Sequence, residues 1–163
     1  MTSLRWTVPV AAVAVLLALA PVASAGAKYD RVTGGGQVAV GTNDTSNPTT
    51  AGDNISFVAR RYGASLFDTK GQTQYVDRTA AGNVTRHGVV TCLNVQSAQN
   101  ATFAGVWGDG TFFKINVTDN GQGAGSNADM IAIDVDSGDD DCSTFDGSNN
   151  PNMALARGNA QIY

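Results

Sequence analysis

Five aspartates lie close together in the last third of the chain and have the chemistry to bind a cation. In the stretch DVDSGDDDC they are Asp134, Asp136, Asp139, Asp140 and Asp141. Calcium takes about six to eight oxygen ligands, which flexible acidic loops supply. The stretch departs from an EF-hand loop, because it has no Gly at the sixth position and no Glu at the twelfth. We therefore interpret the stretch as a solvated acidic loop that needs no cofactor, with a calcium site formed by these five aspartates as the alternative.

Hydrolytic chemistry has less support in the residues. His87 is the only histidine, and no serine stands in a G-x-S-x-G turn, so we interpret His87 as a surface residue of a strand. A glycosidase needs two carboxylates about 5 to 9 Å apart, and fourteen aspartates make such a pair easy to form by chance. We predict that the chain is not an enzyme. A polysaccharide hydrolase that uses paired aspartates is an alternative function.

Two cysteines, Cys92 and Cys142, are the only candidates for a covalent cross-link. Neither belongs to a C-x-x-C motif, so a structural disulfide is the preferred interpretation over a metal or redox site. The loop that the bond would close has about 50 residues, and the chain-entropy model rates its contribution at about 4 kcal/mol. The pair predicts an oxidising compartment.

Aromatic side chains could form platforms on which sugar rings stack. The candidates are Tyr62, Tyr75, Trp107, Phe112 and Phe113. Alternation along the chain places several of these rings in the core, so packing is the expected role for most of them. Together with the aspartates, they leave a calcium-dependent carbohydrate-binding module as another alternative function.

Residues 1–25 have the features of a secretory signal peptide. Arg5 precedes an apolar run over 8–19, and Ala23-Ser24-Ala25 matches an A-x-A cleavage site. We therefore expect a secreted, extracellular protein with one β domain over residues 26–163. No second long apolar run follows, so we expect no membrane span after the signal is cleaved.

The composition narrows the range of partners. The formal net charge is −4, and all fourteen acidic residues are Asp. An acidic chain is poorly suited to nucleic acid, where Lys and Arg must neutralise phosphates. The expected role is structural or one of extracellular interaction, with a glycan, a cell surface or another protein as the partner. The oligomeric state stays open.

Strand and turn signals run through the chain from residue 32 onward. In Asn54–Tyr62 the residues Ser56, Val58, Arg60 and Tyr62 share one face, opposite an apolar face. Gly108-Asp109-Gly110 between two alternating runs predicts a hairpin, and Thr69-Lys70-Gly71 predicts another turn. The fold that we expect is all-β, an antiparallel β-sandwich or a jelly-roll-like barrel of about eight strands.

Four segments carry a resemblance to a known group of proteins. They are VTGGGQV, ISFVARR, TFFKINVTDNGQG and the terminal GNAQIY. In these motifs, residues 31–163 resemble small secreted bacterial β domains of the post-COAP type. The resemblance implies an all-β fold and an extracellular location, and it implies no catalytic or binding residue. The two cysteines and the acidic stretch are not part of the shared pattern.

Overall fold

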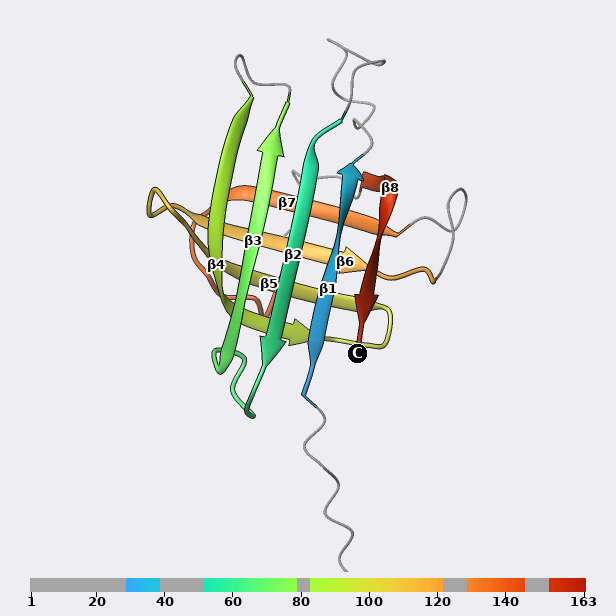
Figure 1. Cartoon of the computed structure of the whole chain (residues 1–163). Helices are drawn as coiled ribbons and strands as arrows, with labels where there is room; N and C mark the ends of the chain where they lie inside the picture. The colour runs from blue at the N-terminus through green and yellow to red at the C-terminus, as the bar shows by residue number, and fades with distance from the viewer. Residues whose placement is uncertain (1–28, 39–51, 79–82, 122–128, 146–152) are drawn as a thin grey trace, which may run out of the picture.

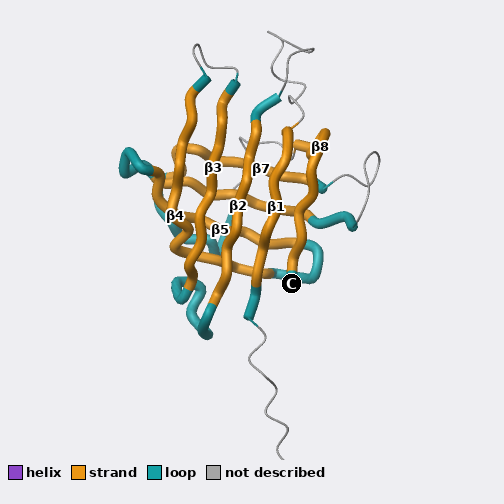
Figure 2. Tube along the Cα trace, in the orientation of Figure 1, coloured by secondary structure: helices purple, strands orange, loops and turns teal. Residues whose placement is uncertain are grey.

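Eight antiparallel strands form a closed barrel in the computed structural model of the chain (Figure 1). The structure describes residues 29–38, 52–78, 83–121, 129–145 and 153–163. The strands are β1 (Arg31–Val38), β2 (Asn54–Arg61), β3 (Thr69–Asp77), β4 (Val84–Val95), β5 (Asn100–Trp107), β6 (Phe112–Thr118), β7 (Met130–Ser137) and β8 (Met153–Ile162). Within these ranges, Figure 2 shows strands and loops and no helix.

The order of the strands differs in detail from a sandwich or a jelly roll. Each strand pairs with the next one along the chain, and β8 pairs with β1 to close the barrel. A jelly roll needs connections that cross from one sheet to another, whereas each connection here joins two strands that are neighbours in the barrel. The all-β class and the eight strands are confirmed, and the barrel is an up-and-down one.

The barrel is flattened into two layers that cross at a steep angle (Figure 1). Strands β1 to β4 and β8 make one layer, and β5 to β7 lie behind it. Strand β4 belongs to both, because its first half pairs with β3 and its second half with β5. A shift of register between Val90 and Cys92 marks the corner, where a bulge lets one strand bend between layers.

One predicted turn is wrong. Thr69-Lys70-Gly71 lies inside β3, and the reversal of the chain falls at 62–68 instead. Gly71 is needed in the strand, because a Cβ atom there would lie 2.1 Å from the carbonyl oxygen of Val58. The glycine therefore allows β2 and β3 to approach closely, and it does not mark a turn. The Gly108–Gly110 turn is confirmed, with Gly110 at a φ of 89°.

Aromatic rings fill the space between the two layers. Phe103 packs against Phe57 with ring centroids 5.1 Å apart, and Trp107 packs against Phe113 at 4.4 Å. The Trp107 indole N–H donates to the carbonyl oxygen of Val135 at 3.0 Å, so the one polar atom of this buried ring has a partner. The large rings of the barrel interior are therefore packing groups, the role that the sequence predicts for most of the aromatic candidates.

The seam between β7 and β8 is held by a buried carboxylate. The two strands share only two paired positions, Met130 with Ala154 and Ile131 with Met153. Asp129, 3% exposed, accepts the backbone N–H of Ala160 at 2.6 Å and that of Asn120 at 2.8 Å. A side chain thus takes the place of ladder hydrogen bonds where the two strands diverge.

The predicted signal peptide, residues 1–25, lies outside the described residues. In the part of the chain that the structure describes, no helix has the length and apolar character that would let it cross a membrane.

Candidate functional site

The five aspartates of the candidate calcium site lie along one segment at the end of β7, and no described hydrogen-bond donor is shared by the carboxylates of two of them. Asp134 accepts the backbone N–H of Asp136 at 3.2 Å. Asp140 accepts the hydroxyl of Thr91 at 2.8 Å. Asp141 accepts the backbone N–H of Ser143 at 2.8 Å. Within the described residues, no three acidic, His or Cys side chains converge on one point. The carboxylates of the segment therefore make separate bonds, some within the segment and some to other strands.

Asp139 has the strongest electrostatic partner in this segment. Its carboxylate accepts the backbone N–H of Asp141 at 3.0 Å and the ammonium of Lys114, on β6, at 3.1 Å. These bonds, the backbone one first, lower the pKa of Asp139 below its ordinary value. The side chain remains 66% exposed, so water screens the pair with Lys114.

Cys92 and Cys142 lie at disulfide distance and fasten the acidic segment to the corner strand β4. Their Cα atoms are 5.8 Å apart, and both side chains are fully buried. Ala104 and Leu66 pack against the two cysteines. The predicted pairing is thus present in the structure, and it joins three parts of the chain: β4, the segment after β7 and the turn at 62–68.

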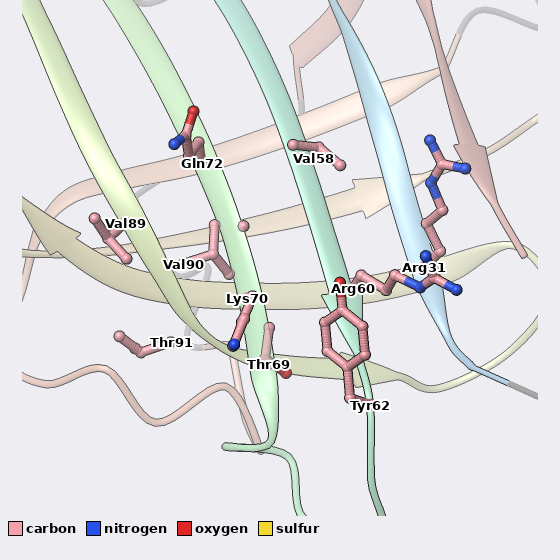
Figure 3. Close-up of a pocket in the computed structure, with 11 residues that line it drawn as sticks. Arg31, Val58, Arg60, Tyr62, Thr69, Lys70, Gln72, Val89, Val90 and Thr91 are labelled. Atoms are coloured by element: carbon pink, nitrogen blue, oxygen red, sulfur yellow. The ribbon is translucent and has the colours of Figure 1, made fainter. Parts of the chain in front are cut away.

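A groove lies on the outer face of the front layer, and Figure 3 shows the residues that line one hollow in it. This hollow of about 660 Å³ lies over β1 to β4. Two further hollows adjoin it and share Val58, Gln72 and Val89 with it. None of the described residues that line any of the three hollows is acidic. The groove therefore differs in charge from the chain as a whole, which has a net charge of −4.

Three cations stand side by side across the groove, and we call Arg31, Arg60 and Lys70 the cation row. In the register of the sheet, Arg31 on β1 pairs with Arg60 on β2, and Arg60 pairs with Lys70 on β3. Residues paired in this way point to the same side of a sheet. All three residues are exposed, so three like charges face solvent together.

Tyrosine rings support the cation row. The guanidinium of Arg60 lies 5.2 Å from the ring centroid of Tyr62 and 5.4 Å from that of Tyr29, and the guanidinium of Arg31 lies 5.8 Å from the ring of Tyr163. No described aspartate lies within ion-pair distance of the cation row. The ion pairs that the structure does describe use other cations, namely Arg61, Arg86 and Lys114.

Amide side chains follow in the next two rows of the same face, and we call them the amide band. One row runs Gln161, Thr33, Val58, Gln72 and Val89 across β8, β1, β2, β3 and β4. The following row runs Asn159, Gly35, Ser56, Gln74 and His87. Each primary amide both donates and accepts hydrogen bonds. The face therefore offers cations along one edge and neutral hydrogen-bonding groups beside them.

Sequence patterns found parts of this surface without assembling it. The prediction that Ser56, Val58, Arg60 and Tyr62 share one face is confirmed, and the structure shows that this face is exposed, with Tyr62 50% exposed. His87 lies exposed on the outer face, as interpreted. What the sequence missed is the alignment of the three cations, because Arg31, Arg60 and Lys70 come from separate strands. Only the strand register brings them together.

The most strongly shifted described group, Tyr75, lies at the far end of β3 from the cation row. Its hydroxyl donates to the carboxylate of Asp53, which also accepts the backbone N–H of Arg78 at 2.8 Å. Burial, and then the bond to Asp53, raise the pKa of Tyr75 well above its ordinary value. These contacts join the residue before β2 to the end of β3, which is a structural role.

Comparisons with known proteins complete the description of the site. No protein-family model, curated protein or solved structure matches this chain.

Proposed function

We propose that the protein is a secreted, non-enzymatic binding domain, and that the outer groove over β1 to β4 binds an extracellular glycan. The observation that carries the proposal is the register of the face, which lines up cations, amides and an exposed tyrosine in a groove without a described carboxylate. A polysaccharide presents many hydroxyl groups and apolar ring faces. Amides suit the former, and exposed aromatic rings suit the latter.

The shape of the groove also favours a chain-like ligand. The three adjoining hollows cross several strands, from Arg31 on β1 to Val106 on β5. Val58 and Val89 are 40% and 60% exposed at its centre, which is unfavourable for a surface that stays in water. A bound sugar ring would cover these side chains while its hydroxyl groups bond to Gln72 beside them.

Secretion is part of the proposal and is supported by two features. The residues of 1–25 have the order of a signal peptide. The Cys92–Cys142 pair at disulfide distance suits an oxidising compartment. A mass measurement on the mature protein, before and after reduction, tests both at once, because cleavage after Ala25 and the loss of two hydrogens each give a defined mass.

Calorimetric titration of the purified protein with a panel of soluble polysaccharides tests glycan binding. The double variant Gln72→Ala/Gln74→Ala removes two amides of the amide band. We expect it to bind at least about fivefold more weakly, since each hydrogen bond contributes about 0.5 to 1.5 kcal/mol. Gln99→Ala is the matched control, because Gln99 lies in the turn between β4 and β5, outside the groove.

Three results would contradict the proposal. If no polysaccharide of the panel binds, the groove has another role. If reducing ends accumulate during incubation with a ligand and their release stops in an Asp→Asn variant, the protein is a hydrolase. Equal affinity of the double variant and Gln99→Ala would place the binding site on another surface.

A further inference from the structure

We infer that the ligand of the groove is a polysaccharide that carries carboxylates, and that these carboxylates pair with the cation row. This inference rests on the proposed function and adds the chemical class of the ligand. The distribution of charge in the protein is unusual. The protein is acidic overall, yet three of its cations face solvent together, and no described aspartate lies within ion-pair distance of them.

The cation row opposes the stability of the fold. Neighbouring strands lie about 5 Å apart, so the row holds three positive charges on backbones within about 10 Å. Like charges directly opposite one another in a sheet are destabilising. Surfaces that carry such a cost are typical of functional sites. A ligand with anionic groups recurring along its length would remove the repulsion.

The surroundings of Arg60 favour a carboxylate attached to a sugar ring. The guanidinium contacts the rings of both Tyr29 and Tyr62, whose centroids are 6.1 Å apart, so the three groups form a compact cluster. Contact with two rings restricts the guanidinium, and its planar set of donors matches the two oxygens of a carboxylate. In an acidic sugar the carboxylate is bonded to the ring itself, so one residue of the ligand can reach both Arg60 and Tyr62.

The neutral rows of the same face favour a sugar chain over a nucleic acid as the ligand. Nucleic acids need cations along the whole contact, because every nucleotide carries a phosphate. Here the rows next to the cation row hold neutral groups, such as Gln72, Ser56 and Gln74. A ligand with anions on one edge and hydroxyl groups elsewhere fits this division, and an acidic polysaccharide has that form.

Titration with polygalacturonate and with its carboxyl-reduced derivative tests the inference. The two polymers share their linkage and differ in charge, so the comparison isolates the carboxylates. We expect at least tenfold tighter binding of polygalacturonate at low salt. The difference should shrink in 1 M salt, where the screening length falls to about 3 Å. Dextran sulfate and single-stranded DNA serve as polyanions of other kinds.

Matched variants locate the contact on the cation row. We expect Arg60→Gln to weaken the binding of polygalacturonate at least tenfold, and Lys70→Gln about fivefold, because a lysine offers no bidentate geometry. Lys114→Gln removes the same charge from β6 in the back layer, outside the groove, and should leave the affinity unchanged. Melting temperatures within a few degrees of wild type show that the variants are folded.

Several results would overturn the inference. Equal binding of both polymers would overturn the role of the carboxylates and leave the proposed function standing. Binding of neither polymer would overturn the inference, and failure of the whole glycan panel would remove the proposed function as well. Equal or tighter binding of dextran sulfate or DNA would overturn the choice of a carboxylate ligand. Loss of binding in Lys114→Gln would place the contact outside the cation row.

Discussion

The acidic segment at the end of β7 (residues 134–141) and the cation row on β1 to β3 both concentrate charge, and they differ in the partners of their charged groups. In the acidic segment, Asp139 has Lys114 and a backbone N–H as partners, and Asp140 has Thr91. In the cation row, Arg60 has tyrosine rings and two neighbouring cations. Most carboxylates of the first cluster therefore have partners within the fold, whereas the cations of the second have no described counter-ion and are available to a ligand.

The lengths of the side chains explain the difference. An aspartate reaches the backbone N–H two residues ahead of it, so an acidic loop can satisfy its own carboxylates, as Asp141 does with Ser143. Arginine and lysine in a strand point away from their own backbone, and their partners must come from neighbouring strands. Where those neighbours are also cations, as at Arg60, the charge stays without a counter-ion.

Removing the disulfide is expected to have the largest effect, because it frees the acidic segment from β4. The bond spans 50 residues, and the chain-entropy model gives a loss of about 4 kcal/mol in the free energy of unfolding for Cys92→Ala/Cys142→Ala. Urea unfolding of the two proteins at neutral pH measures the difference. A loss below about 1 kcal/mol would mean that other contacts hold the segment, and that its order does not depend on the bond.

Two aspartate variants compare how much a buried and an exposed carboxylate contribute to the free energy of unfolding. Asp129→Asn replaces one acceptor oxygen with an N–H₂ group that faces a backbone N–H, at a site only 3% exposed, so we expect a loss of about 2 kcal/mol. Asp136→Asn, on the exposed acidic segment, should stay within about 0.5 kcal/mol of wild type. Equal losses in urea unfolding would contradict the distinction between these sites.

Two lysine variants compare the charge clusters directly. Lys70→Gln relieves repulsion in the cation row and should raise the free energy of unfolding by a few tenths of a kcal/mol at low salt. Lys114→Gln breaks the exposed pair with Asp139 and should lower it by about 0.5 kcal/mol. Both differences should vanish in 1 M salt, where exposed charges are screened. A loss of stability in Lys70→Gln would show that the cation row supports the fold.

Local patterns predicted the elements of this fold and much less of their arrangement. The alternation in 54–62 and the Asp-Gly turn at 109–110 identified strands and a hairpin correctly, because both depend on residues a few positions apart. Gly71 misled for a physical reason: a glycine serves a turn and a close approach of two strands equally well. The order of the strands depends on long-range packing, which no local pattern contains.

The site was less predictable than the fold. The aspartates from 134 to 141 attract notice because they are adjacent in the sequence, whereas the cation row combines residues as far apart as Arg31 and Lys70. Their alignment depends on the register of β1, β2 and β3, and a slip of one residue would turn each cation to the other face. Such a surface is visible only after the strands are paired.

Calcium should have the smallest effect of all, since four of the five carboxylates of the acidic segment already accept hydrogen bonds, and no three converge among the described residues. A bound ion would raise stability by mass action. For extracellular calcium sites with dissociation constants of about 0.1 to 1 mM, 5 mM calcium would add about 1 to 2 kcal/mol and several degrees of melting temperature. We expect no shift in a thermal melt. A rise that EDTA reverses, and that Asp139→Asn abolishes, would show that the segment rearranges around the ion, and it would restore a calcium-dependent role for the acidic segment.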